Sequence, residues 1–400
     1  MKSWAEISKT RLARNYRLLQ EAARAEVSVL AVVKANGYGH GAALCAPELV
    51  RTGAEWLGVT DAVEGACVRK ALSEAGVRAA QQPRILVMSG SLEEDAATLL
   101  KEDLTPVVAT IQQMEWMLEA ARGRLIQPLR VHLEIDTGMS RQGVTTGAPL
   151  DDLLEWIRLH PDISLDGVMT HFASAEIAGS HQSMEQRVRF ERAIEQLAGY
   201  GLRPAWLHAG NSSAIDNGAE GTLAWLRPLA RSLGAKAMVR SGLALYGYAL
   251  EIEPEPGYSG SLGALVRPRL EPVMTWKARV LEVHEIAAGE RVGYNGTFLA
   301  ERAMRLALLP VGYADGLRRE LSSTADTTRG WVMISGRRAP IVGRVSMNLT
   351  VVDVTGHDRV EPKDEAVVLG EGVTAEDHAR IAGTISYEIL CGIKVPRRLV

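Results

Sequence analysis

The chain has 400 residues, and its 45 lysine and arginine residues nearly balance its 48 aspartate and glutamate residues, giving a net charge of −3. A balanced charge gives no electrostatic reason to expect nucleic acid or an anionic membrane surface as a partner, and we expect neither. The length suits one large domain followed by a smaller one.

Cysteine usage and the N-terminal sequence favour a reducing compartment. Cys45, Cys67 and Cys391 are scattered and lack the spacing of a metal site. We expect small buried side chains there, and no metal. The N-terminus has no apolar core of signal-peptide length, and no run approaches the roughly 20 apolar residues that a membrane span needs. We therefore expect a cytoplasmic protein.

Short apolar runs alternate with helical stretches over the first part of the chain. A helix is expected from Ser8 to Ala25, and helical periodicity returns in Ile111–Arg122 and His181–Tyr200. The apolar runs are Val27–Ala35, Trp56–Thr60, Arg84–Ser89, Thr105–Ala109, Arg130–Asp136, Leu165–His171, Ala205–Ala209 and Ala237–Tyr246. This alternation predicts an α/β fold, a (β/α)8 barrel of the TIM type, over residues 8–250.

The alternation of apolar runs and helical stretches ends after residue 250. Residues 251–265 read as a linker because proline and glycine are frequent in them. Residues 266–400 predict a mostly β domain, to which residues 1–7 are a candidate additional strand. Its alternating runs are Met274–Ile286, Arg305–Gly312, Trp331–Ser335, Ile341–Val345 and Leu349–Val354. One helix is expected over Thr374–Ala382, because Thr374 and Asp377 stand close to a capping-box spacing.

Polar residues gather at the ends of the barrel runs. In this fold the active groups come from the C-terminal ends of the strands. The residues in such positions are Lys34, Arg141, His171, Asn211, Ser212 and Arg240. Their convergence on one face of the barrel favours an enzyme.

Lys34 stands where a buried, valine-rich run meets a glycine-rich turn. A lysine there suits pairing with a phosphate or a Schiff base with a carbonyl; the alternative is a lysine that emerges into water. The segment Val-Val-Lys-Ala-Asn-Gly-Tyr-Gly-His-Gly resembles the lysine segment of the alanine racemases, barrel enzymes that use pyridoxal 5'-phosphate. In that family the lysine carries the cofactor and the tyrosine four residues later contacts its phosphate. The resemblance implies these roles for Lys34 and Tyr38.

The resemblance extends to further phosphate contacts. The segment His208-Ala209-Gly210-Asn211-Ser212 matches the family's His-x-x-Asn-Ser, whose serine holds the phosphate. The backbone of Gly242 and Leu243 and the side chain of Tyr387 match other phosphate contacts of the family. Without the family, asparagine and serine at this position are ordinary turn formers.

Two residues match groups that surround the cofactor ring in the family. Arg240 matches an arginine beside the pyridine nitrogen, where a group that cannot give up its proton keeps that nitrogen unprotonated and the ring a weaker electron sink. His171 matches a histidine against the ring face, which we expect to support the ring rather than carry protons. The alternatives are a salt-bridged arginine and a structural histidine.

The strand before the Asp136–Gly143 segment holds the one informative departure. Arg141 matches an arginine that binds the cofactor's phenolate oxygen and the substrate carboxylate. Where the family often has a carbamylated lysine, this chain has Glu134. We expect Glu134 to orient Arg141 by an ion pair or a bridging water; the alternative is a glutamate exposed to water.

The second domain carries the other half of the implied mechanism. Tyr294 matches the family's second catalytic base, Tyr313 would line the entrance, and the backbone of Met347 would contact the substrate carboxylate. In the family the second base comes from the partner subunit, so the resemblance implies a homodimer with shared sites.

The expected function is the interconversion of L-alanine and D-alanine, supplying D-alanine for cell-wall peptidoglycan. Inversion needs a proton removed from one face and returned on the other, so two bases are expected. The resemblance assigns Lys34 to the D-enantiomer and Tyr294 to the L-enantiomer. Three alternatives remain: a serine or broader-specificity racemase, a barrel decarboxylase, and a non-catalytic carrier of the cofactor.

Overall fold

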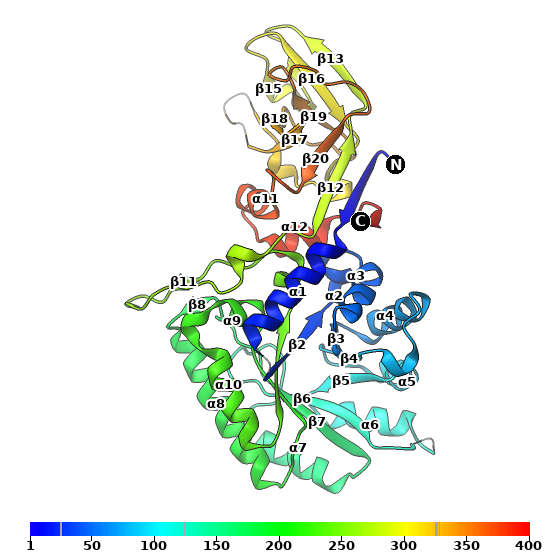
Figure 1. Cartoon of the computed structure of the whole chain (residues 1–400), viewed down its shortest axis with the longest axis vertical. Coiled ribbons are helices and arrows are strands. Elements are labelled where there is room, and N and C mark those ends of the chain that lie inside the picture. The colour runs from blue at the N-terminus through cyan, green and yellow to red at the C-terminus, as the bar shows by residue number, and fades with distance from the viewer. Residues whose placement is uncertain (25, 124, 325–326, 328) are drawn as a thin grey trace. The chain divides into compact units, whose positions relative to one another are not determined.

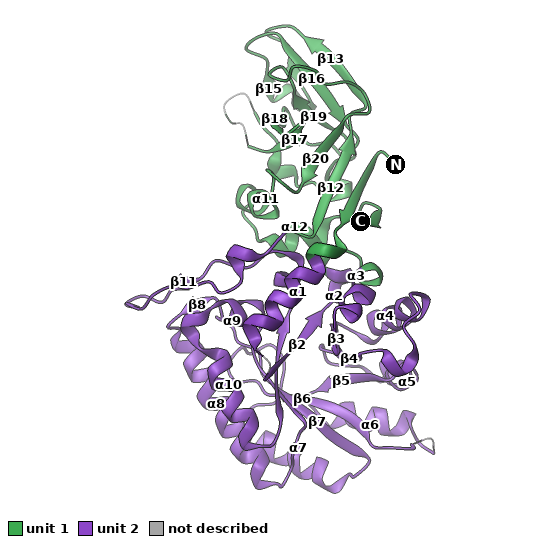
Figure 2. Cartoon of the chain, viewed as in Figure 1, with its two compact units in different colours: residues 1–11, 38–44, 272–400 green, residues 12–37, 45–271 purple. Residues whose placement is uncertain are grey.

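The computed structural model describes residues 1–24, 26–123, 125–324, 327 and 329–400. The chain divides into two compact units (Figure 2). Unit 1 comprises Met1–Arg11, Tyr38–Leu44 and Pro272–Val400, and unit 2 comprises Leu12–Gly37 and Cys45–Glu271. Residues 251–265, expected to form a linker, belong to unit 2, and residues 1–7 belong to unit 1.

Unit 2 contains a closed barrel with the strand order β10-β2-β3-β4-β5-β6-β7-β9 (Figure 1). The strands are β2 (Val27–Val32), β3 (Trp56–Val59), β4 (Arg84–Val87), β5 (Leu104–Val108), β6 (Leu129–Glu134), β7 (Ile163–Met169), β9 (Trp206–His208) and β10 (Lys236–Ser241). Neighbouring strands pair in parallel all round the barrel. The predicted (β/α)8 barrel is confirmed, and every predicted run overlaps one of its strands.

Helices follow most of the barrel strands along the chain. They are α1 (Lys9–Ala23), α3 (Ala42–Arg51), α4 (Ala62–Glu74), α5 (Ala96–Lys101), α6 (Ile111–Ala120), α7 (Ala148–Leu159), α8 (His181–Gly199), α9 (Ser212–Asp216) and α10 (Thr222–Ser232). The start of α6 is fixed by a capping box between Thr110 and Gln113. The expected first helix begins at Lys9, and its expected last residue, Ala25, lies outside the described residues.

Burial of the strands stabilises the barrel. Leu30 on β2 and Leu57 on β3 are fully buried, and each such side chain contributes roughly 1.5–3 kcal/mol relative to exposure. The run Ala237–Tyr246 is only partly strand: β10 ends at Ser241, and a short 3-10 turn follows over Leu243–Tyr246. A small two-stranded ladder joins β8 (Ile177–Ala178) to β11 (Glu253–Pro254).

Unit 1 is mostly β, as predicted. Its largest sheet has six strands in the order β18-β17-β20-β12-β1-β21, beside a three-stranded sheet β13-β16-β19 and a hairpin β14-β15. The strands are β1 (Ser3–Ile7), β12 (Met274–Arg279), β13 (Glu282–Ile286), β14 (Arg291–Val292), β15 (Phe298–Leu299), β16 (Met304–Leu309), β17 (Trp331–Ile334), β18 (Arg337–Pro340), β19 (Thr350–Asp353), β20 (Glu365–Leu369) and β21 (Arg397–Leu399). The helices are α11 (Ala375–Ala382), capped by Thr374, and α12 (Ser386–Gly392).

Two of the alternating runs in this unit do not form a single strand. The run Met274–Ile286 forms two strands in different sheets, because the extended strand is interrupted between Arg279 and Glu282. The run Ile341–Val345 is not a strand. Gly343 adopts φ +70°, and a Cβ there would come 2.8 Å from the carbonyl oxygen of Val292, so the chain turns tightly at this point.

Two general expectations can be compared with the structure. None of the helices in the described part of the chain has the length and apolarity of a membrane span. Cys45 is buried as expected, but Cys67 and Cys391 are exposed. Cys67 lies on α4 beside Val68, which is one of the residues that this helix buries.

Candidate functional site

Arg240 is the centre of a polar group at the C-terminal ends of the barrel strands. It is buried near the end of β10. Its Nη2 donates to the carbonyl oxygen of Thr170 at 2.8 Å and to Nδ1 of His171 at 3.1 Å. Its Nη1 lies 3.3 Å from Nδ1 of His208. Arg240 therefore ties the ends of β7 and β9 to its own strand.

The charges around His171 show which predicted residues converge. Burial lowers the pKa of His171 to about 3, and the positive charges of Arg240, Arg141 and Lys34 act in the same direction. Burial also lowers the pKa of Arg240 to about 10, against the opposing charge of Glu134. At neutral pH, His171 is neutral and Arg240 is a cation. Four residues predicted from separate strand ends thus lie within electrostatic reach of one another.

Lys34 follows β2 and is half-buried. The residues after it, labelled α2 (Lys34–Tyr38), form a left-handed turn, with φ of +51° at both Ala35 and Asn36 and +65° at Gly37. The Gly37 N–H donates to the Val33 carbonyl at 2.7 Å. Non-glycine residues rarely adopt this conformation, and such strain clusters at functional sites. The strained turn therefore favours a functional role for Lys34 over the alternative of a lysine that emerges into water.

A set of hydrogen-bond donors lies where β9 and β10 end. The buried hydroxyl oxygen of Ser212 accepts from the N–H groups of Gly242 at 3.0 Å and Ala244 at 3.2 Å, and lies 3.2 Å from the hydroxyl of Ser241. Leu243, which stands between Gly242 and Ala244 in the sequence, is buried. Hydroxyl and backbone N–H groups after the last two strands are the donor types that bind phosphate in barrels.

Asn211 has a structural task beside this set. Its side-chain oxygen accepts from the N–H of Ala214 at 3.1 Å and so caps α9. The cap fixes the position of Ser212, the first residue of the helix. Asn211 therefore positions the expected phosphate-binding serine.

The loop after β6 presents Arg141 from a rigid turn. One carboxylate oxygen of Asp136 accepts from the N–H groups of Gly138 at 2.9 Å and of Met139 and Ser140 at 3.1 Å. Arg141 follows directly and is exposed. Its guanidinium is held on a fixed backbone without being buried, which suits binding of a small carboxylate.

Glu134 is buried, with only 3 % of its surface exposed, so the alternative of a solvent-exposed glutamate is wrong. Its hydrogen-bond partner also differs from the one expected. Glu134 Oε2 accepts from Nε2 of Gln142 at 2.5 Å, and that amide nitrogen also donates to the Met88 carbonyl at 3.0 Å. Burial raises the pKa of Glu134, while the charges of Arg240 and Arg141 oppose the rise. Glu134 is therefore linked to the Arg141 loop by its hydrogen bond with Gln142.

In unit 1, the structure brings together two tyrosines predicted to bind phosphate. The rings of Tyr38 and Tyr387 have centroids 5.9 Å apart. Burial raises the pKa of Tyr38, and Tyr387 contributes to the rise. The Tyr38–Leu44 segment packs closely on α12: a Cβ at Gly39 would lie 2.0 Å from the Leu390 carbonyl oxygen. Only glycine allows this approach.

The remaining predicted residues of unit 1 stand on exposed loops. Tyr294, on the turn between β14 and β15, is 68 % exposed, Tyr313 is 45 % exposed and Met347 is 56 % exposed. The Ala314 N–H donates to the Met347 carbonyl at 2.9 Å, so the last two residues lie on adjoining loops. A Cβ at Gly293 would come 3.1 Å from the N atom of Arg344. The Tyr294 turn thus packs on the same 343–347 segment.

Sequence reasoning missed a buried polar group inside the barrel. His132, Asp166 and Arg84 were not singled out, and His208 was noted only as part of a motif. Each is a polar residue on a barrel strand, on β6, β7, β4 and β9 respectively. That pattern was the available signal, but it could not show that the residues meet.

Comparisons with known proteins identify the family of both units. Residues 7–250 match the family model for the alanine racemase N-terminal domain, and residues 273–399 match that for the C-terminal domain. An alanine racemase of Symbiobacterium thermophilum is 37% identical over 99% of this chain and 96% of its own length. One of Syntrophobacter fumaroxidans is 35% identical over 98% of this chain and 95% of its own length.

A solved structure gives the same result. The alanine racemase from Streptomyces coelicolor has a TM-score of 0.86 and 33% sequence identity, covering 100% of this chain and 98% of its own. The two family models together match residues 7–250 and 273–399, and the solved structure shares the fold over the whole chain. The chain therefore belongs to the alanine racemase family, isomerases that interconvert the enantiomers of alanine.

Proposed function

We propose that this chain interconverts L-alanine and D-alanine with pyridoxal 5'-phosphate bound to Lys34. The observation that carries the proposal is the convergence of Lys34, Arg141 and Arg240 around a neutral His171 at one end of the barrel. An amine beside fixed cations suits an anionic, carbonyl-bearing cofactor.

The donor set fits this cofactor. The Lys34 amine would hold its aldehyde carbon, and the Ser212 hydroxyl with the N–H groups of Gly242 and Leu243 would hold its phosphate. Asn211 positions Ser212. When bound, the cofactor supplies a conjugated ring that acidifies the α-hydrogen of the amino acid.

Further residues of the chain complete the cofactor contacts. Tyr38 and Tyr387, whose rings lie together, add hydroxyl groups for the phosphate. Arg240 offers only N–H donors, so beside a pyridine nitrogen it donates a hydrogen bond without transferring a proton. His171 accepts from Arg240 and stays neutral, which suits packing against a ring rather than proton transfer.

Two residues move the proton at the α-carbon. Lys34 Nζ takes or returns it on the face used by D-alanine, and the Tyr294 hydroxyl does so on the face used by L-alanine. Two bases on opposite faces are needed because one base on one face tends to restore the starting enantiomer.

The substrate carboxylate is held by the Arg141 guanidinium and the backbone of Met347, and Tyr313 lines the entrance. The Arg141 loop is rigid because Asp136 binds its backbone, and the pair of Glu134 and Gln142 anchors its far side. Binding energy is then available for orientation rather than for ordering a loop.

A homodimer with shared sites follows from the family. It is supported by the exposure of Tyr294, Tyr313 and Met347 on loops of unit 1. Large side chains left exposed together suit an interface with a second copy, which would receive Tyr294 beside its own Lys34. We place the reaction in the cytoplasm, as a source of D-alanine for peptidoglycan.

The test is the loss of optical rotation when the purified protein, with pyridoxal 5'-phosphate, is incubated with single L-amino acids. Racemisation of alanine far above serine, lysine and arginine is expected. Equal rates on several amino acids would make the enzyme a broader racemase. Carbon dioxide release without inversion would contradict the proposal.

A further inference from the structure

A buried line of hydrogen bonds leads from Arg240 away from the site, through the interior of the barrel. Nη1 of Arg240 lies 3.3 Å from Nδ1 of His208. Nε2 of His208 lies 2.8 Å from Nδ1 of His132, and Nε2 of His132 lies 3.1 Å from Asp166 Oδ2. The same carboxylate oxygen lies 2.7 Å from Nη1 of Arg84. The line thus joins strands β10, β9, β6, β7 and β4.

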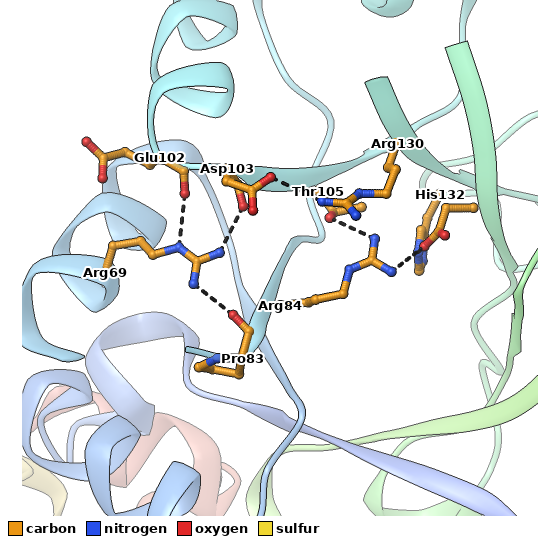
Figure 3. A network of polar contacts seen from close by, with 9 residues as sticks. Arg69, Pro83, Arg84, Glu102, Asp103, Thr105, Arg130 and His132 are labelled. Carbon is orange, nitrogen blue, oxygen red and sulfur yellow. Dashed lines mark hydrogen bonds and ion pairs between the residues drawn. The ribbon is translucent and has the colours of Figure 1, made fainter. Parts of the chain in front are cut away.

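The far end of the line is a polar cluster near the N-terminal ends of the strands, formed by Arg84, Asp166, Thr105, Arg130 and Asp103 (Figure 3). Arg84 also donates to the Thr105 hydroxyl at 3.3 Å and lies 4.1 Å from the ring centre of Trp56. The charge of Arg84 and the hydrogen bond from His132 help keep the pKa of Asp166 below its usual value, against its burial. Asp166 is therefore an anion at neutral pH and can only accept hydrogen bonds.

The anion at this end sets the direction of every hydrogen bond in the line. Because Asp166 only accepts, Nε2 of His132 must carry the proton, and Nδ1 of a neutral His132 must accept. Nε2 of His208 then carries a proton, which leaves Nδ1 of His208 as an acceptor. Arg240 can only donate, and it meets that acceptor.

The surroundings keep both imidazoles neutral and fixed. His132 and His208 have no exposed surface, and burial is the main cause that lowers the pKa of each ring. A Cβ at position 167 would come 2.5 Å from Nδ1 of His132, so Gly167 leaves the space that the ring needs. The ring of Trp56 lies 5.2 Å from that of His132. The line is a packed part of the core.

We propose that Asp166 is a positioning residue for the reaction: acting through His132 and His208, it presents an unprotonated nitrogen to Arg240 and so holds the guanidinium where it would meet the pyridine nitrogen of the cofactor. This inference rests on the proposed function, because it assigns Arg240 to that ring. The same line gives a role to the ion pair of Asp166 and Arg84, which lies at the end of the barrel remote from the proposed active site.

The first test is the 15N NMR spectrum of histidine-labelled protein, with and without pyridoxal 5'-phosphate. His132 and His208, assigned from the spectra of His132→Gln and His208→Gln, are expected to be neutral between about pH 6 and 8, with the proton on Nε2. A proton on Nδ1 of either ring, or a charged ring, overturns the proposal. The wild-type spectrum decides this point even if a variant fails to fold.

The second test uses Asp166→Asn, whose amide can donate to His132 and so permits the reversed order. Part of the His208 signal is expected to move to the Nδ1-protonated form, and kcat for alanine is expected to fall about tenfold, with KM changing less than about twofold. Asp166→Glu, which keeps a carboxylate, is expected to restore both the tautomers and most of kcat.

Asp103→Asn is the matched control. Asp103 lies in the same cluster and pairs with Arg130 at 3.3 Å, but its side chain is exposed, and the carboxylate that His132 contacts is that of Asp166. We expect it to leave the tautomers and kcat unchanged. A reversed tautomer in Asp166→Asn with unchanged kcat would overturn the positioning role, whereas an inactive wild-type protein would contradict the proposed function.

Discussion

Nη2 of Arg240 donates to Nδ1 of His171 over 3.1 Å, and this contact relates the charge states of both side chains. A guanidinium can only donate, so Nδ1 of His171 must be unprotonated. Burial and the nearby cations lower the pKa of His171 to about 3, so the ring does not change charge between pH 5 and 9. His171 therefore orients neighbouring groups, and the proton transfers fall to other residues.

Replacing Lys34 tests the assignment of the cofactor. Lys34→Ala removes the only amine assigned to the cofactor's aldehyde and one of the two bases. We expect loss of the visible absorbance of the bound cofactor and a fall in kcat of at least about a thousandfold. A variant that keeps the absorbance band of the wild type would show that another amine holds the cofactor.

Ser212 is expected to act on the phosphate alone. In Ser212→Ala, the affinity for pyridoxal 5'-phosphate should fall about tenfold or more, because a hydrogen bond to a charged group is lost. The affinity for pyridoxal, which lacks the phosphate, should not change. Ser213→Ala is the control, since Ser213 is buried next in the chain but lies outside the donor set. Equal losses for both ligands would rule out the phosphate role.

The two faces of the α-carbon can be separated with Tyr294→Phe. Lys34 still reaches the hydrogen of D-alanine in this variant, whereas no base serves L-alanine. In 2H2O we expect D-alanine to exchange its α-hydrogen without inversion, and L-alanine to exchange at least about a hundredfold more slowly. Proton NMR and chiral chromatography measure the two processes. Equal exchange of both enantiomers would remove Tyr294 from the mechanism.

Glu134 is expected to act on substrate binding through Gln142. Glu134→Gln removes the charge that faces Arg240 and Arg141, and it weakens the 2.5 Å contact that anchors the loop. We expect KM for alanine to rise about tenfold, with a smaller change in kcat. Gln142→Ala should have a similar effect on KM. If both variants keep the wild-type KM and turnover, neither residue positions Arg141.

His378 links stability to pH. Burial lowers the pKa of His378 on α11 to about 4, whereas an unfolded histidine titrates near pH 6.5. Between these values the unfolded chain binds a proton that the folded chain does not. The free energy of unfolding therefore falls on acidification through this window, by roughly 3 kcal/mol for one such group. In His378→Leu this part of the slope should disappear, which denaturant unfolding at pH 7 and pH 5 measures.

The exposed His181 provides the control for that experiment. His181→Gln should leave the pH slope of the wild type unchanged. An unchanged slope in His378→Leu would contradict the linkage.

The strands of the barrel could be predicted because each is a short apolar run between helical stretches. Local pattern also predicted Lys34, Arg141, His171 and Arg240, since each stands at or near a strand end. The left-handed turn after Lys34 could not be predicted, because Ala35 disfavours that conformation, and a single asparagine followed by glycine does not indicate consecutive left-handed residues.

Other features depend on contacts between distant segments. His132 meets His208 only because β6 and β9 lie on either side of β7 in the closed barrel, and nothing in either strand signals the contact. The same holds for Gln142, whose partner Glu134 was expected to pair with Arg141. At Ile341–Val345, an apolar pattern was overruled by the tight packing of Gly343 on Val292.

The most direct test of the central claim is to incubate L-alanine with the cofactor-loaded protein in 2H2O and to follow both enantiomers and their α-deuterium content. We predict that the mixture converges on equal amounts of the two enantiomers, with deuterium at the α-carbon of the D-alanine formed. L-alanine that keeps both its configuration and its α-hydrogen, in protein that holds the cofactor, would contradict the account.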